Sequence, residues 1–303
     1  GDGALSLERR PIPALQGPRD AIVRVTRSTI CTSDLHIRSG AVPRARPGVV
    51  LGHEFVGVVE AVGNGISNLR PGDRVAACCE SFCGDCWFCR RGYVNNCIHG
   101  GWELGCRIDG CQAEYVRVPF ADTGLTPIPD ALSDEDALFV GDILASGYWG
   151  AELCAFQPGD TAVVLGLGPV GLCAAECAAL LGAAHVIGVE PECFMAQDLQ
   201  HDGLTQLIVT RSMAERKSRM IELGDAFIAF PGGTGTLEEI TEVMSQVSLG
   251  QLSAPCILYD LDGYYRHLKA LLDHMIASGL SSPERQQGIH FAQNLPEIQV
   301  LLS

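Results

Sequence analysis

Basic residues are scarce in this sequence. Lys and Arg together number 21 against 36 Asp and Glu, which gives a formal net charge of −15. Because neutralising phosphate groups requires clustered Lys and Arg, this balance argues against nucleic acid or an anionic membrane surface as a partner. A small neutral substrate, or one guided by a few local charges, fits the composition better.

The sequence also lacks a long uninterrupted apolar run. Its first ten residues, GDGALSLERR, have no apolar core of the kind that a secretory signal needs, so a cytoplasmic location is expected. The longest weakly polar run, residues 161–189, is broken by glycines, a proline, Glu176 and His185. This pattern predicts a buried strand, a turn, a helix and a second strand rather than a membrane span.

Extensive disorder is excluded, because 47% of the residues are hydrophobic and 19% are charged. At 303 residues the chain is long enough for about two domains, each with its own core. Cysteine, in contrast, is abundant: 14 are present, and thirteen of them lie at or before Cys193. In a reducing compartment we expect metal ligands among them rather than a disulfide framework. Their uneven distribution indicates that the chain changes character near Cys193.

Four of these cysteines stand close together in SFCGDCWFCRRGYVNNC. Intervals of two, two and seven residues separate Cys83, Cys86, Cys89 and Cys97. Four thiolates on one loop can close a tetrahedral shell around zinc and leave no open position, as a structural site requires. A set of reduced, buried cysteines is the alternative, and the short spacings favour zinc over it.

A second group of metal-binding side chains is scattered over the segments ICTSDLH, LGHEFVG and VGDILASGYWGAE. The candidates in these segments are Cys31, Ser33, Asp34, His36, His53, Glu54 and Asp142. Thiolate, imidazole and carboxylate together can hold zinc and leave one position free for an alcohol or aldehyde oxygen. Any one of these residues taken alone would more often be structural.

A nucleotide-binding signature follows in TAVVLGLGPVGLCAAECAALLGAAHVIGVE. Gly166, Gly168 and Gly171 form the pattern G-x-G-x-x-G between a Val-rich strand and an Ala-rich helix. Glycine there lets the backbone approach a pyrophosphate at the helix N-terminus. Glu190 comes about twenty residues later, where an acid can bind ribose hydroxyls and would repel a 2′-phosphate. The sequence therefore predicts NAD in preference to NADP.

In their order along the chain these motifs resemble the zinc-dependent medium-chain alcohol dehydrogenases, over about residues 4 to 190. The segments that carry the resemblance are GHEFVGVVEAVG, the four-cysteine loop, RPGDRV and GGWELGCRIDGCQAEYVRVP. The resemblance implies a β-rich GroES-like domain with one structural and one catalytic zinc. It also implies hydride transfer between an alcohol or aldehyde and NAD.

The same resemblance assigns roles to individual residues. The catalytic zinc ligands that it implies are Cys31, His53 and Asp142, with Glu54 as a nearby or alternating ligand. Ser33 and His36 would pass the substrate proton to solvent, and Asp34 would hold the imidazole of the histidine ligand.

From about Cys193 onward the sequence does not continue this pattern. QLIVT and AFIAF read as short buried strands, and a helical spacing of apolar residues follows at Leu237, Ile240, Val243, Met244 and Val247. PGGTGT stands between AFIAF and that helix, where its glycines free backbone N–H groups to surround a phosphate. The neighbouring Arg216, Lys217, Glu238 and Glu239 either form solvated helix surface or face the same ligand.

ERK, PGGTGTLEE and YDLDGYY together resemble the LOG family, lysine-decarboxylase-like proteins whose characterised members are nucleoside 5′-monophosphate phosphoribohydrolases. The resemblance covers about residues 191 to 303 and implies that Arg216 and Glu239 serve cleavage of an N-glycosidic bond. The residues that it implies for the 5′-phosphate are Gly232, Gly233, Thr234, Gly235 and Thr236.

The predicted fold class is therefore α/β, in two domains. Residues 1–155 would form the GroES-like zinc-binding catalytic domain, and residues 156–303 a Rossmann-like doubly wound parallel sheet, dehydrogenase-like to about 190 and LOG-like from about 191. Residues 188–194 would be the seam of a hybrid sheet. The preferred function is a zinc- and NAD-dependent dehydrogenase; the alternatives are a nucleoside monophosphate phosphoribohydrolase and a fusion without catalytic activity. Both resemblances lead us to expect a homo-oligomer.

Overall fold

The computed structural model describes residues 4–192, 203–230, 232–260 and 263–302. The chain divides into two compact units, one made of residues 1–155 with 172–177 and the other of residues 156–171 with 178–303. No helix within the described ranges is both long and apolar enough to cross a membrane. Residues 193 and 194 of the predicted seam lie outside the described residues. The assignment of a function to each domain stays a prediction.

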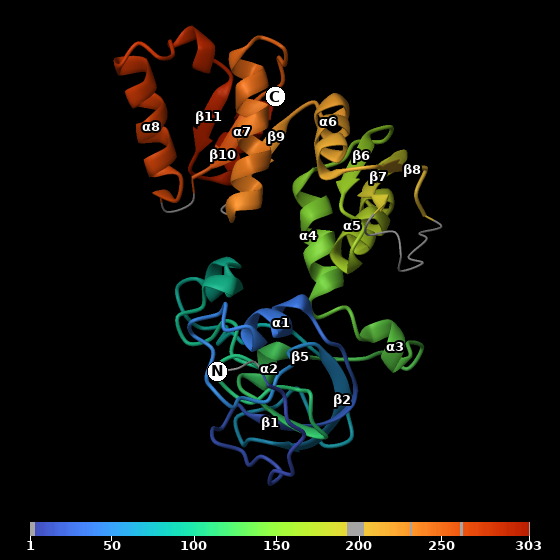
Figure 1. Cartoon of the computed structure of the whole chain (residues 1–303). Helices are drawn as coiled ribbons and strands as arrows, with labels where there is room; N and C mark the ends of the chain where they lie inside the picture. The colour runs from blue at the N-terminus through green and yellow to red at the C-terminus, as the bar shows by residue number, and fades with distance from the viewer. Residues whose placement is uncertain (1–3, 193–202, 231, 261–262, 303) are drawn as a thin grey trace. The chain divides into compact units, whose positions relative to one another are not determined.

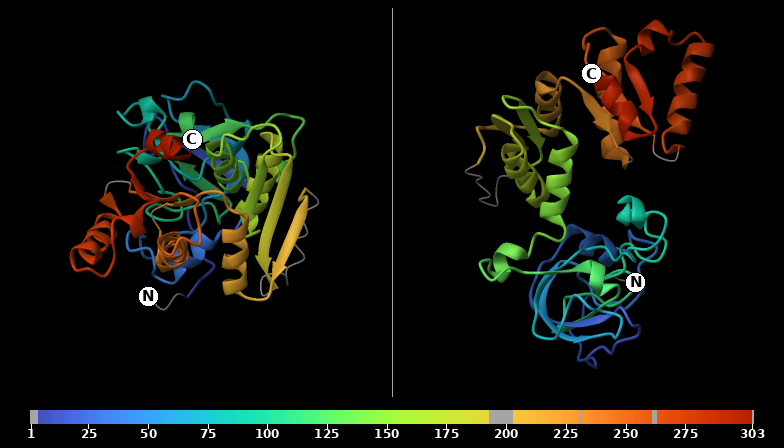
Figure 2. Two further views of the ribbon diagram at one scale, coloured as in Figure 1. Left: turned by 90° about the horizontal axis from the view of Figure 1, so that it is seen from above. Right: turned by 180° about the vertical axis from the view of Figure 1, so that it is seen from behind.

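An antiparallel sheet organises the first unit (Figure 1 and Figure 2). Its five strands lie in the order β4-β1-β2-β3-β5. The strands are β1 (Ala21–Ser28), β2 (Phe55–Val62), β3 (Arg74–Ala77), β4 (Tyr115–Val118) and β5 (Leu125–Pro127). Because side chains alternate along a strand, alternate residues of β1, from Ala21 to Val25, enter one core. That core contains Val23, Phe55 and Val59, each at most 1% exposed.

Short helices of the first unit lie between these strands or follow them. They are α1 (Thr32–Arg38), α2 (Ala121–Gly124), α3 (Asp134–Ala137) and α4 (Ile143–Leu153), together with two 3-10 turns in the four-cysteine loop, Cys89–Arg91 and Val94–Asn96. Helix α1 carries Ser33, Asp34 and His36. The Ser133 hydroxyl caps α3 by accepting a hydrogen bond from the Asp136 backbone N–H at 3.1 Å.

A parallel sheet, β6-β7-β8, opens the second unit. Its elements are β6 (Thr161–Leu165), α5 (Pro169–Leu180), β7 (His185–Pro191), β8 (Gln206–Thr210) and α6 (Met213–Leu223). The strand, turn, helix and strand predicted for residues 161–189 are confirmed by β6, α5 and β7.

A second parallel sheet has the order β11-β10-β9. Its elements are β9 (Phe227–Ala229), α7 (Thr234–Ser248), β10 (Cys256–Tyr259), α8 (Arg266–Ala277), a 3-10 turn (Glu284–Gln286), β11 (Ile289–Ala292) and α9 (Leu295–Leu302). Leu258 of β10 packs with Ile240 of α7 and Leu272 of α8, whereas the adjacent Ile257 packs with Ile298 of α9. The two faces of this sheet are thus covered by different helices, α7 and α8 on one face and α9 on the other.

The predicted α/β class is confirmed, with an antiparallel β-rich part followed by parallel strands and helices. Written as β8-β7-β6 and β9-β10-β11, the two parallel sheets have the strand orders of the two halves of a doubly wound fold. Among the described residues, β6 and β9 do not pair with each other. β9 lies at the edge of its sheet and has only 3 residues, so it offers few ladder hydrogen bonds to a further strand.

Candidate metal centre and active site

Four potential metal ligands converge in the first unit. The ligand atoms of Cys31, His53, Glu54 and Asp142 all lie within 4.8 Å of one another. Cys31 is the N-cap of α1 and Asp142 is the N-cap of α4, while His53 and Glu54 directly precede β2. Each ligand therefore stands at the start of a regular element, which fixes its backbone. Three distant segments of the sequence supply one compact donor set.

His53 lies at the centre of this group. Its Nε2 is 3.4 Å from Asp142 Oδ2, and its Nδ1 is 3.6 Å from Asp34 Oδ1. The side chains of His53 and Asp34 are 4% and 2% exposed, so both are removed from water. The Cys31 backbone N–H donates to Asp34 Oδ2 at 3.0 Å, and the Gly52 N–H donates to Asp34 Oδ1 at 3.1 Å. These bonds hold the Asp34 carboxylate against the imidazole edge that faces away from Asp142.

Negative charge dominates this buried site. Burial lowers the pKa of His53, but the neighbouring side chains of Asp142, Asp34 and Cys31 outweigh burial and raise the pKa to about 10. Burial and the Asp142 charge raise the pKa of Glu54. His53 Nδ1 and Glu54 Oε2 are buried without a hydrogen-bond partner among the described residues. A donor set that favours a proton on its own imidazole is suited to a cation, and thiolate, imidazole and carboxylate are ligands of zinc.

The two residues expected to relay a proton both lie in α1. Ser33 is half-buried, and its Oγ is 3.5 Å from Cys31 Sγ. His36 is exposed and lies in the last turn of the helix. Residues three apart share one face of a helix, so the structure places Ser33 at the donor set and His36 toward solvent on the same side.

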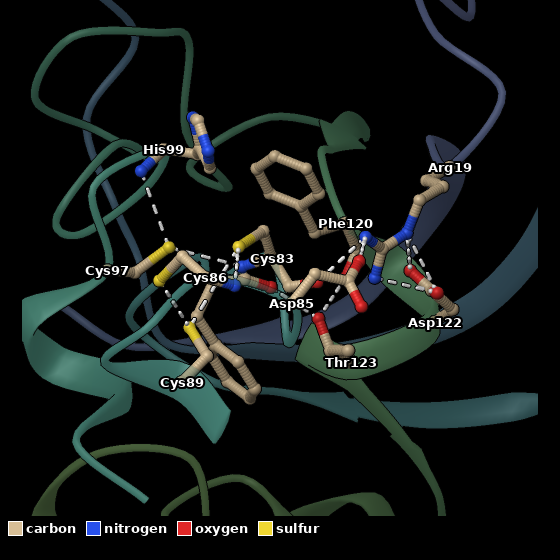
Figure 3. A network of polar contacts seen from close by, with 11 residues as sticks. Arg19, Cys83, Asp85, Cys86, Cys89, Cys97, His99, Phe120, Asp122 and Thr123 are labelled. Carbon is tan, nitrogen blue, oxygen red and sulfur yellow. Dashed lines mark hydrogen bonds and ion pairs between the residues drawn. The ribbon is translucent and has the colours of Figure 1, made fainter. Parts of the chain in front are cut away.

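The four cysteines of the loop also come together. Ligand atoms of Cys83, Cys86, Cys89 and Cys97 lie within 4.8 Å of one another. Backbone N–H groups point at their sulfurs: Cys83 donates to Cys97 Sγ at 3.3 Å, and His99 donates to the same sulfur at 3.4 Å (Figure 3). Backbone N–H groups of Cys89 and Ile98 lower the pKa of Cys86 to about 6. Four converging sulfurs, one of them favoured as thiolate, suit a closed zinc site.

Arg19 fastens this loop to the rest of the unit. Its guanidinium donates to the Cys83 carbonyl at 2.7 Å and pairs with Asp122 at 2.8 Å and Asp85 at 3.2 Å (Figure 3). The Phe120 ring lies beneath the same guanidinium, 5.2 Å from its carbon to the ring centroid. One cation thus links the chain before β1, the cysteine loop and α2.

The predicted dinucleotide turn joins β6 to α5. Gly166 has a φ of 87°, and a Cβ added to Gly171 would lie 1.9 Å from the Gly166 carbonyl oxygen, so both positions require glycine. Gly168, in contrast, is exposed, and a Cβ there would meet nothing within 4 Å. Glu190 is half-buried near the end of β7 and pairs with Val209 of β8. Gly168 thus leaves open space beside the backbone, whereas Gly166 and Gly171 are closely packed, as the dinucleotide-binding motif requires.

The candidate residues of the C-terminal part are brought together between α6 and α7. Arg216 pairs with Glu239 at 3.2 Å, and Lys217 pairs with Glu238 and, at 2.8 Å, with Glu242. The predicted helix over 237–247 is confirmed by α7, whose N-cap is Gly233. A Cβ added to Gly232 would lie 2.3 Å from Thr236 Oγ1, whereas Gly233 and Gly235 have open space. Pro231 of PGGTGT lies outside the described residues.

Two groups near the donor set have no role in the predicted motifs: Trp102 with Arg44, and Cys78 with Cys79. The Trp102 ring lies edge-on to the His53 imidazole with centroids 5.6 Å apart, and the Arg44 guanidinium lies 5.5 Å over the indole. A hydrogen bond with Cys79 lowers the pKa of Cys78 to about 7. The aromatic residue inside the glycine-rich GGWELG and the Cys-Cys dipeptide were the signals in the sequence.

Comparison with known families gives two matches. Residues 17–130 match the alcohol dehydrogenase GroES-like domain, and residues 173–301 match a family described as possible lysine decarboxylase. Both predicted resemblances are confirmed. The second match begins inside α5, earlier than residue 191.

The curated relatives are dehydrogenases. An alcohol dehydrogenase from Cupriavidus necator is 41% identical over 206 residues, which cover 62% of this chain and 55% of that protein. A zinc-type alcohol dehydrogenase-like protein from Schizosaccharomyces pombe is 38% identical over 211 residues, with 62% and 50% covered. The chain spans about half the length of these curated relatives.

Solved structures extend the likeness beyond the first unit. Alcohol dehydrogenase TADH from Thermus sp. ATN1 is 34% identical with a TM-score of 0.68, over 94% of this chain and 89% of that chain. A zinc-binding dehydrogenase from Sinorhizobium meliloti, bound to NADP, is 28% identical with a TM-score of 0.66, over 85% and 74%. Fold and site together define a GroES-like α/β protein. The chain belongs to the zinc-type alcohol dehydrogenase family, and its residues 173–301 also match the lysine-decarboxylase-like model.

Substitution of Cys89 by Ser should remove one bound zinc ion per chain and lower the melting temperature, because a hydroxyl replaces one of four soft ligands. Cys154 is exposed and outside both clusters, so Cys154→Ser is the matched control and should change neither quantity. Zinc content by elemental analysis and thermal unfolding would measure both. An unchanged zinc content in Cys89→Ser would show that the four sulfurs do not hold metal.

Two alanine substitutions in the glycine turn should behave differently. Gly171→Ala should lower the free energy of unfolding by about 1–3 kcal/mol, because the new Cβ meets the Gly166 carbonyl oxygen. Gly168→Ala should leave stability unchanged and weaken NADH binding, because its Cβ enters the space that a pyrophosphate needs. Denaturant unfolding and fluorescence titration with NADH separate the two effects. Equal NADH affinity of wild type and Gly168→Ala would contradict this assignment of the turn.

Proposed function

We propose that the chain is a zinc- and NAD-dependent dehydrogenase that transfers hydride between an alcohol or aldehyde and NAD. The observation that carries this proposal is the convergence of Cys31, His53, Glu54 and Asp142 within 4.8 Å. This donor set would hold a catalytic zinc through Cys31, His53 and Asp142, with Glu54 beside it. Zinc bound there supplies Lewis-acid polarisation of the substrate oxygen.

The chain's own residues orient the ligands and move the proton. Asp34 faces His53 Nδ1 and so keeps Nε2 turned toward Asp142, the arrangement that a histidine ligand needs. Ser33, next to Cys31 Sγ, would accept the proton of an alcohol, and His36 would carry it from the same helix face to solvent. The electron pair left on the substrate oxygen would form the carbonyl double bond as the substrate carbon gives up its hydride to NAD.

The four-cysteine loop and the glycine turn would hold the other two groups. Cys83, Cys86, Cys89 and Cys97 offer four converging sulfurs for a structural zinc. Gly166, Gly168 and Gly171 would receive the cofactor pyrophosphate, and Glu190 would bind its ribose hydroxyls, which supports NAD. The structural neighbour from Sinorhizobium meliloti is bound to NADP. The preference for NAD over NADP in this chain is therefore supported by the Glu190 carboxylate and not by that neighbour.

The wider setting of the protein is also a proposal. The names of the relatives, alcohol dehydrogenases, support a small-molecule alcohol or aldehyde as substrate. Two cysteine clusters free of disulfides support a reducing, cytoplasmic location. The homo-oligomer expected from both resemblances stays a prediction.

The zinc-loaded protein should form NADH, measured by absorbance, with at least one member of a panel of primary and secondary alcohols. Cys31→Ser should abolish the signal because it replaces a soft zinc ligand by a hydroxyl. Cys154→Ser is the control and should retain full activity, since its exposed thiol lies outside both clusters. A folded, zinc-loaded protein that reduces NAD with none of the alcohols would refute the dehydrogenase proposal.

A second candidate function is hydrolysis of a nucleoside 5′-monophosphate to free base and ribose 5-phosphate. The observation that favours it is the ion pair at 3.2 Å between Arg216 and Glu239, next to the glycine-rich start of α7. In this reading Gly232 to Thr236 hold the phosphate, and Glu239 stabilises an oxocarbenium-like ribose or activates water.

Adenine release from AMP, followed by chromatography, tests this second function. Glu239→Gln should abolish release, whereas Glu238→Gln, which alters the neighbouring acid paired with Lys217, should retain it. Intact AMP after long incubation with the wild-type protein would remove this candidate. If both assays fail on a folded sample, the remaining alternative is a fusion without catalytic activity.

A further inference from the structure

Gln112 links two of the segments that carry metal ligands. Its backbone N–H donates to the Leu51 carbonyl at 2.9 Å, two residues before His53. Its side-chain Nε2 donates to Asp34 Oδ2 at 3.1 Å, three residues after Cys31. Gln112 thus bonds through its main chain to the loop that carries the histidine ligand. Through its side-chain amide it bonds to α1, the helix that begins at the cysteine ligand.

The Gln112 amide acts on the metal-ligand histidine through Asp34. Oδ2 of Asp34 accepts from the Gln112 amide and from the Cys31 backbone N–H, and Oδ1 accepts from the Gly52 N–H and faces His53 Nδ1 at 3.6 Å. The carboxylate side chain is 2% exposed, whereas Gln112 is exposed, so the amide is the outermost of these donors. Fixing Oδ2 also fixes the direction in which Oδ1 faces the imidazole, because the carboxylate is planar.

The packing around Gln112 leaves little freedom. Gly52 has a φ of 96°, and a Cβ added to it would lie 2.7 Å from Gln112 Cγ. A Cβ added to Gly110 would lie 2.0 Å from the Gly52 carbonyl oxygen, and Cys111 donates to that same oxygen at 3.0 Å. The backbone around Gln112 is therefore closely packed, and its side chain extends toward Asp34.

We propose that Gln112 is a positioning residue of the catalytic metal centre, which sets the orientation of His53 through Asp34 and holds the Cys31 and His53 loops in register. This inference rests on the proposed zinc site. Without the amide donor, Asp34 keeps its bonds from the Cys31 and Gly52 N–H groups, but the carboxylate is held less firmly about its terminal torsion. His53 then loses part of the constraint that directs Nε2 into the donor set.

The test compares three variants of the full chain loaded with zinc. Gln112→Leu removes the donor at similar size, and Gln112→Glu keeps the shape but places an acceptor against the Asp34 carboxylate. Gln16→Leu, at an exposed glutamine of the same unit, is the matched control. Zinc affinity is measured by competition with a chelator, with the four-cysteine site of the same molecule as an internal reference. Cobalt substitution supplies a second readout, since its absorption bands report the geometry of the ligands.

Gln112→Leu should weaken zinc binding at the Cys31 site by about 10-fold and shift the cobalt bands, with the four-cysteine site unchanged. In Gln112→Glu, zinc binding at the Cys31 site should be weakened at least as much. A side chain that only filled space would not show this loss, because glutamate has nearly the same shape as glutamine. Gln16→Leu should match the wild type. The inference is overturned if Gln112→Leu and Gln112→Glu both bind zinc and cobalt as the wild type does. A wild-type protein that takes up zinc only at the four-cysteine site would instead overturn the proposed function, and the inference with it.

Discussion

The structure of the candidate site depends on the burial of several acids around one imidazole. Asp34, Glu54 and Asp142 surround His53, and two of these acids, Asp34 and Glu54, are almost fully buried. Removing charges from water costs several kcal/mol per ion unless opposite charge or hydrogen bonds compensate. Here backbone N–H groups satisfy Asp34, and a proton on His53 or a bound cation must offset the rest. The glycine-rich turns at 52, 105 and 110 pack backbone against backbone, so this arrangement has little room to relax.

Much of this site was visible in the sequence, because the information is local. The spacing of four cysteines within one loop predicted one cluster, and the short motifs around Cys31, His53 and Asp142 named the members of the other. The convergence of those three motifs is not a local property, and here the resemblance to a family supplied what periodicity could not. Gln112 illustrates this limit. Nothing in the segment GCQAEYVRV distinguishes it, and its hydrogen bond to Asp34 becomes visible only in the folded chain.

The second unit shows a different limit. Each βαβ segment was predictable from alternating strand and helix patterns, as β6, α5 and β7 demonstrate. Whether β6 and β9 pair depends on contacts between segments that resemble different families, and no pattern within either segment encodes that pairing. A strand of 3 residues at this position can form few ladder bonds, whichever family supplied it. Single elements were thus predicted correctly, whereas the described residues form two parallel sheets and not one continuous sheet.

The two helices that begin at ligands have an electrical consequence. Cys31 and Asp142 are the N-caps of α1 and α4, where unpaired backbone N–H groups create about half a positive charge. Two members of the donor set thus stand at the positive ends of two helices. The scaffold thus supplies part of the counter-charge for these two side chains through its backbone. Because the same positive helix ends oppose a cation, the attraction of the site for a metal ion comes from its side chains and not from the helices.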